Sequence, residues 1–93
     1  MEDTTPRRRL HCRLAALTLE HNARVADGQI PGPPLSQRVI ADRTGLSLGA
    51  VNRLAQGQPV RIASETVERI CDLLGCDVGD LLVLREVEQN SDA

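Results

Sequence analysis

The sequence predicts an all-α domain built from five helices, with room for short strands at its two ends. Apolar residues recur with helical spacing through most of the chain, and glycine or proline interrupts them at short intervals. The chain has 93 residues and no Phe, Trp or Tyr, so its core must be built from Leu, Ile, Val and Ala, which suits packed helices. This length allows one small domain.

The first helix is expected at residues 10–27, where Leu10, Leu14 and Leu17 follow a helical spacing with alanines between them. Gly28 then ends the helix. The following segment GQIPGPP has three prolines within four residues and cannot remain helical. We therefore expect a surface loop there, in which residues 30–34 are either a tolerated extension of the loop or a contact for a partner.

Two short helices joined by a glycine turn are expected at residues 36–56. Ser36 is a good N-cap for a helix over residues 37–43, and Gly45 ends this helix at a position that usually needs a positive φ. Ser47 caps the next helix, which runs to about residue 56. The pair forms a helix-turn-helix, in which one helix can enter a DNA major groove while the other lies across the backbone.

The C-terminal third predicts an amphipathic helix followed by a short one. The amphipathic helix begins at Ser64 and ends at Gly75, and Asp77 can cap the short helix. The apolar stripe of the amphipathic helix, at i, i+3, i+4 and i+7, consists of Val67, Ile70, Cys71 and Leu74. Residues 82–87, LVLREV, alternate and fit a short strand as well as they fit a continuation of the short helix.

Charge is unevenly distributed along a chain whose net charge is only −2. Residues 36–61 carry four Arg and one Asp, and residues 7–13 carry four more Arg. From residue 65 onward, eight acidic residues accompany two Arg. A basic half beside an acidic half suits a surface that faces phosphates, and ordinary scatter of charge is the alternative. All 11 basic residues are Arg, which we attribute to compositional bias.

Several classes of function lack support in the sequence. No apolar run approaches the roughly 20 residues of a membrane span and no signal peptide is recognisable, so we expect a cytoplasmic protein. His11 and His21 have no accompanying nucleophile or acid pair, so we expect no enzyme activity, cofactor or small-molecule substrate. The lack of aromatic side chains also argues against binding single strands by base stacking.

The three cysteines are expected to be buried thiols. Their odd number argues against a framework of disulfide bonds. The spacing of Cys71 and Cys76 is not that of a zinc site, so no metal is expected. Redox or metal sensing through Cys12 is an alternative that no other residue supports.

The run LSQRVIADRTGLSLGAVNRL at residues 35–54 resembles the helix-turn-helix of the lambda-repressor-like, or Cro/Xre-type, DNA-binding family. The later SETVERICDLLGCDVGDLL resembles that family's fourth and fifth helices, so the likeness covers roughly residues 10–84. It implies a five-helix lambda-repressor-like domain that binds duplex DNA. We expect this domain at residues 10–87, between a flexible arm at residues 1–9 and a disordered tail at residues 88–93.

The resemblance also implies which residues contact DNA. Contacts to base edges are expected from Ser47, Leu48, Gly49, Asn52 and Arg53. Contacts to phosphates are expected from Ser36, Gln37, Arg38 and Arg61. Arg53 suits a bidentate contact to guanine and Asn52 one to adenine, whereas Leu48, Gly49 and Ala50 have no side-chain hydrogen-bonding group. We therefore expect sequence preference to be low, or to depend partly on DNA shape.

One helix-turn-helix contacts only a few base pairs, so we expect a homodimer that binds a pseudo-palindromic operator and regulates transcription as a repressor. The apolar residues expected at the dimer contact are Val78, Leu82, Leu84 and Val87. In related small proteins terminal segments pair as short strands, which RRRLHC and LVLREV can also do. The alternative function is a protein-interaction module of antitoxin or anti-repressor type with the same fold.

Overall fold

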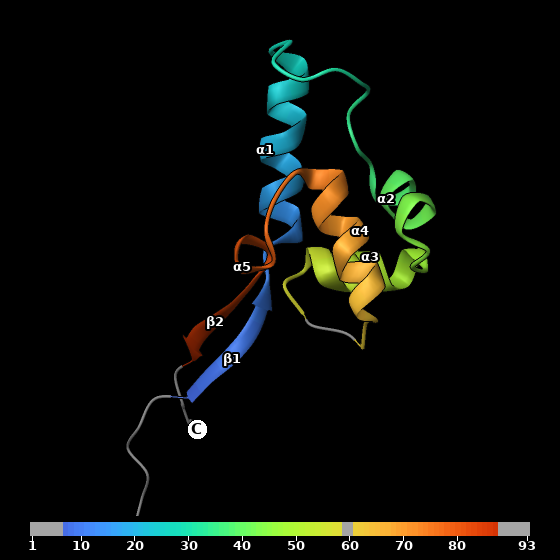
Figure 1. The fold of residues 1–93 in the computed structure, drawn as a ribbon. Helices are drawn as coiled ribbons and strands as arrows, with labels where there is room; N and C mark the ends of the chain where they lie inside the picture. Colours follow the sequence, from blue (N-terminus) through green and yellow to red (C-terminus); the bar gives the residue numbers. More distant parts are fainter. Residues whose placement is uncertain (1–6, 59–60, 88–93) are drawn as a thin grey trace, which may run out of the picture.

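The computed structural model describes residues 7–58 and 61–87, which form a helical body and a two-stranded ribbon that extends from it (Figure 1). In chain order the elements are β1 (Arg7–Cys12), α1 (Leu14–Ala26), α2 (Gln37–Thr44), α3 (Leu48–Ala55), α4 (Ser64–Leu74), α5 (Val78–Leu81) and β2 (Leu82–Val87). The structure is therefore mostly helical, as predicted, with one small sheet formed by segments from the two ends of the chain.

The first helix is shorter than the sequence predicted. Leu10, which we placed in this helix, belongs to β1, and α1 begins only at Leu14. The physical reason is pairing: β1 runs antiparallel to β2, with Leu10 opposite Leu84 and Cys12 opposite Leu82. The expected pairing of RRRLHC with LVLREV is thus confirmed within one chain. Residues 7–9, assigned to a flexible arm, lie in the same strand, whereas residues 1–6 and 88–93 lie outside the described residues.

The helix ends in the second half of the chain follow the predicted signals. Helix α4 begins at Ser64, and Gly75 is its C-cap. Asp77 is the N-cap of α5, and its backbone N–H donates to Oδ2 of Asp80 at 3.1 Å. Asp80 is therefore part of the cap of α5.

A single aliphatic core lies where the five helices meet. Its most deeply buried members are Leu14, Ile40, Val51, Leu54, Ile70 and Leu81. Thr44 is the buried polar residue of the described chain, and its Oγ1 donates to the Ile40 carbonyl at 2.7 Å, so its hydroxyl is not left unpaired. Cys12 and Leu82 extend the core into the base of the ribbon.

The ribbon has two chemically different faces, because directly opposed residues of antiparallel strands point to the same side of a sheet. One face carries the apolar pairs Leu10–Leu84 and Cys12–Leu82 and continues the core. The other face carries Arg9 opposite Arg85 and His11 opposite Val83.

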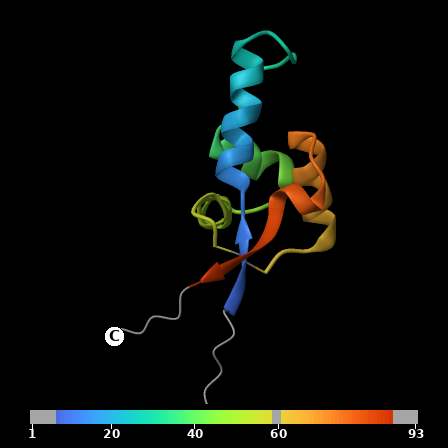
Figure 2. The ribbon, with the colours of Figure 1, turned by 90° about the vertical axis from the view of Figure 1, so that its left-hand side faces the viewer.

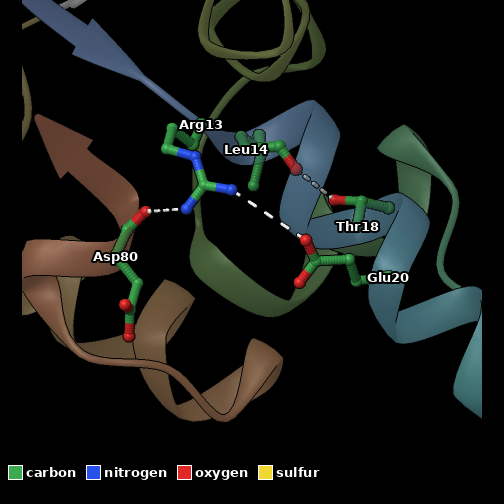
Figure 3. A network of polar contacts seen from close by, with 5 residues as sticks. All are labelled: Arg13, Leu14, Thr18, Glu20 and Asp80. Carbon is green, nitrogen blue, oxygen red and sulfur yellow. Dashed lines mark hydrogen bonds and ion pairs between the residues drawn. The ribbon is translucent and has the colours of Figure 1, made fainter.

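Backbone and side-chain contacts fasten the base of the ribbon to the helical body. The Cys12 N–H donates to the Gly57 carbonyl at 3.1 Å, and the Arg13 N–H donates to the Leu81 carbonyl at 2.7 Å. The Arg13 guanidinium also donates to the Asp80 carbonyl at 3.1 Å and lies 3.9 Å from a carboxylate oxygen of Glu20 (Figure 3). Because the ion pair is partly exposed, we expect most of the anchoring to come from the hydrogen bonds.

None of the helices that the structure describes combines the length and the apolarity needed to cross a lipid bilayer.

Candidate nucleic-acid interface

Helices α2 and α3 are joined by a three-residue turn whose geometry depends on Gly45. Gly45 has φ +81°, in the left-handed region, and its N–H donates to the Ala41 carbonyl at 2.9 Å. A Cβ at this position would meet only Arg69 Nη1 at 3.6 Å, so backbone conformation and not space explains the glycine. The sequence predicted this glycine turn, and Gly45 ends α2 in the structure.

Both helices begin at the serine caps that the sequence predicted. Ser36 Oγ accepts the Val39 N–H at 3.2 Å, and Ser47 Oγ accepts the Ala50 N–H at 3.1 Å. Each hydroxyl is exposed and retains its own proton for donation. The two helix N-termini are therefore structurally defined and accessible to phosphate oxygens.

Helix α3 has one face locked into the core and one face open to solvent. Val51 and Leu54 are 0 % and 2 % exposed and anchor the inner face. On the outer side, all five predicted base-contacting residues are exposed: Ser47, Leu48, Gly49, Asn52 and Arg53. Leu48 is 47 % exposed, which leaves a large apolar side chain on this surface.

The predicted phosphate-contacting residues lie on either side of α3 in the chain. Ser36, Gln37 and Arg38 are exposed at the start of α2, and Arg61 is exposed in the segment that leads to α4. The ion pairs found within residues 7–58 and 61–87 are Arg13–Glu20 and Arg69–Glu65. The exposed guanidinium groups of Arg38, Arg53 and Arg61 thus have no described carboxylate within ion-pair distance.

Comparison with known families agrees with this geometry. The model of the Cro/C1-type HTH DNA-binding domain matches residues 35–86, which is more than half of the chain and includes both α2 and α3. The chain belongs to the Cro/C1-type HTH DNA-binding family. Searches of curated proteins and of solved structures gave no match.

The predicted dimer residues of this Cro/C1-type domain are not equally available. Val78 and Leu84 are 51 % and 55 % exposed, whereas Leu82 packs against the core. The side chain of Val87 lies outside what the structure describes. Among the described side chains of this set, Val78 and Leu84 are therefore the ones that another molecule can reach.

The cysteines of this Cro/C1-type domain are packing residues in the structure. Cys12 and Cys71 are buried, and Cys76 is partly buried. Burial raises the pKa of Cys12 and of Cys71, and burial together with the neighbouring Cys71 raises the pKa of Cys76 to about 11. Within the described ranges no three His, Cys, Asp or Glu side chains gather as a metal site would require.

One feature near α3 was not predicted from the sequence. A half-open hollow of about 350 Å³ lies between the C-terminal end of α3, the start of α1 and the ribbon. Its polar lining comes from His11, Arg13, Gln56 and Arg85. The alternation of Arg9 and His11 along one strand, with Arg13 directly after its end, was the available signal, but it has meaning only once the strand and its partner are known.

Proposed function

We propose that this chain is a sequence-specific duplex-DNA-binding transcriptional regulator that acts as a repressor. The observation that carries this proposal is the two-sided chemistry of α3. Its inner face is buried through Val51 and Leu54, and its outer face presents polar groups that no packing contact requires. A helix held in this way can enter a major groove without rearranging the core.

The exposed side chains of α3 suit a modest sequence preference. Arg53 can donate two hydrogen bonds to guanine, and Asn52 can pair with adenine in the same manner. Leu48, at the first turn, can pack on a thymine methyl group. Because Gly49 adds no functional group, the shape of the duplex contributes the remaining discrimination.

Phosphate contacts on both sides of α3 would set the position of the domain on the duplex. Gln37 and Arg38 lie at the start of α2, and Arg61 follows α3. Their contacts carry no base information, but they supply much of the binding free energy through release of counterions.

We further propose that the chain binds its operator as a homodimer, with half-sites about 34 Å apart. The outer edge of β2 is the better pairing edge, because β1 has the sequence RRRLHC and two copies of its arginines would repel each other. In β2, LVLREV places the exposed Leu84 near the middle of the strand. Two β2 strands related by a two-fold axis can place Leu84 against its own copy. Repression then needs nothing beyond occupancy of the operator.

The test is a gel-shift titration of the full chain against a pool of random-sequence duplexes over a series of salt concentrations. If Arg38, Arg53 and Arg61 bind the duplex, the affinity should fall steeply as the salt concentration rises. Selection from the pool should also enrich a sequence with two-fold symmetry. A variant with both Asn52→Ala and Arg53→Ala should lose the enrichment, whereas Arg24→Ala, on the far end of α1, should keep it. Absence of any retained duplex at low salt would refute the proposal and favour a protein-interaction module.

A further inference from the structure

The polar face of the ribbon brings together charges that the fold itself does not need. We call Arg9, His11 and Arg85 the basic ribbon face. Arg9 lies directly opposite Arg85 in the register, and both side chains are exposed. Like charges directly opposed across two strands destabilise a sheet. In the described part of the chain no carboxylate lies within ion-pair distance of either guanidinium.

Arg85 is held in a defined orientation on this face. Its Nη1 lies 3.1 Å from Nε2 of His11, which is its diagonal neighbour on β1. A guanidinium has no acceptor, so Arg85 is the donor and Nε2 of His11 accepts. The contact directs the Arg85 side chain along the ribbon toward the helical body.

The basic ribbon face lies beside the C-terminal end of the recognition helix α3. His11 and Arg85 line the same hollow as Ala55, Gln56 and Gly57, which end α3. The hydrogen bond from Cys12 to Gly57 fixes the two segments at this distance. Figure 2 shows α3 nearly end-on next to the ribbon, with β2 running toward the same side of the molecule as α3.

A purely structural role accounts for only part of this arrangement. A cation near the C-terminal end of a helix is stabilised by the helix dipole, which suits Arg85. It does not explain Arg9, which lies farther out on the ribbon and lines a second surface hollow together with Leu10, His11, Arg85 and Glu86. Arg9, as a second cation opposite Arg85, lowers the stability of the free protein. This repulsion is compensated only when an anion binds to the two guanidinium groups.

We propose that the basic ribbon face binds the phosphate backbone of the duplex next to the groove that α3 occupies. Arg9 and Arg85 each contact one phosphate, so the ribbon extends the interface beyond the helix-turn-helix. The proposal rests on the DNA-binding function proposed above. It identifies two phosphate-contacting residues outside the elements that form the helix-turn-helix.

The experiment compares two double variants with equal loss of charge. The test variant is Arg9→Gln with Arg85→Gln, and the control is Arg24→Gln with Arg69→Gln, whose arginines lie in α1 and α4. Binding of the full chain to its selected duplex is measured over a salt series. The test variant should lower the steepness of log K against log salt by roughly 1.8, because each lost phosphate contact removes about 0.9. The control should keep the wild-type slope.

A single charge reversal separates binding from folding. Arg9→Glu places opposite charges across the two strands, so its melting temperature should equal or exceed that of the wild type. Its affinity for the duplex should nevertheless fall several-fold, and alkylation of the phosphate that Arg9 contacts should no longer interfere with its binding. A structural role for Arg9 would not weaken binding in a better-folded protein.

The two proposals fail in different ways. If the wild-type chain binds no duplex, the proposed function falls and the ribbon contact falls with it. If the wild type binds and both double variants share its slope and affinity, only the ribbon contact is refuted. If Arg9→Glu binds the duplex as tightly as the wild type, the ribbon contact is also refuted.

Discussion

The side-chain amide of Asn22 pairs with both backbone polar groups of Leu35. Asn22 Oδ1 accepts the Leu35 N–H at 2.7 Å, and Nδ2 donates to the Leu35 carbonyl at 2.9 Å. Leu35 is buried, and Ser36, the cap of α2, follows it directly. The pair therefore fixes the point at which the proline-rich loop rejoins the core, and with it the start of the helix-turn-helix.

Removing this pair should destabilise the fold. Asn22→Ala leaves two partly buried backbone groups of Leu35 without partners, so we expect the free energy of unfolding to fall by about 1–3 kcal/mol. Urea denaturation followed by circular dichroism measures the change. Asn52→Ala, on the exposed face of α3, is the matched control and should stay within about 0.5 kcal/mol of the wild type. Equal losses in the two variants would show that the Asn22 contact adds nothing.

Gly57 is predicted to be the least replaceable glycine of the chain. It has φ +88°, and a Cβ there would overlap the imidazole ring of His11, reaching Nδ1 within 2.8 Å. Gly28 has a similar φ of +74° but open space around it. Gly28→Ala therefore costs only the left-handed conformation, about 1–2 kcal/mol, and Gly57→Ala should cost about 1–3 kcal/mol more. Thermal melting of the two variants measures the difference. Similar losses of stability would mean that His11 moves away from the added methyl group at little cost.

Stability should decrease between about pH 9 and about pH 11 because of the thiols. Burial raises the pKa of Cys76 to about 11, so the unfolded chain loses this proton at lower pH than the folded chain does. The stabilisation is complete below the pKa of the unfolded thiol, near 9, and is lost as pH rises through about 11. The chain has neither Lys nor Tyr, so few other side chains titrate in this range.

The measurement is the urea midpoint between pH 8 and pH 11.5, and it should fall across this range. Cys76→Ser is the matched variant, because a hydroxyl does not titrate there and the fall should be smaller. A midpoint that is independent of pH in the wild type would contradict the raised pKa values.

The helix-turn-helix was predictable because its determinants are local. Ser36, Gly45 and Ser47 each act on backbone groups within four residues, so the caps and the turn are visible in a short window of sequence. The exposure of Asn52 and Arg53 follows from the helical period once Val51 and Leu54 are assigned to the core.

The ribbon was only partly predictable because its pairing is long-range. Leu10 and Leu14 fit a helical spacing, and only the pairing of residues 7–12 with residues 82–87 decides for a strand. The meeting of His11 with Arg85 and of both with the end of α3 depends on this pairing. No window of sequence contains that information, so the basic ribbon face became visible only in the folded chain.

Disrupting the apolar centre of β2 should dissociate the proposed dimer. Leu84→Glu places two carboxylates against each other across the two-fold axis, so sedimentation equilibrium should shift from dimer to monomer. Leu84 is 55 % exposed in the single chain, so the fold itself should change little. Leu19→Glu, at a position 73 % exposed on α1, is the control and should remain dimeric. Dissociation by both variants, or by neither, would argue against β2 as the interface.

Base contacts and phosphate contacts predict different patterns of loss. Arg53→Ala removes the side chain best suited to guanine, so it should cost about 1–3 kcal/mol on the preferred duplex and little on a duplex with that base pair changed. Gln37→Ala removes the phosphate contact proposed at the start of α2 and should weaken binding to both duplexes by the same factor. Fluorescence anisotropy titrations of the two proteins against both duplexes at one salt concentration give the four comparisons needed. A loss from Arg53→Ala that is equal on both duplexes would place Arg53 on a phosphate, and discrimination would then depend on Asn52, Ser47 and the shape of the duplex.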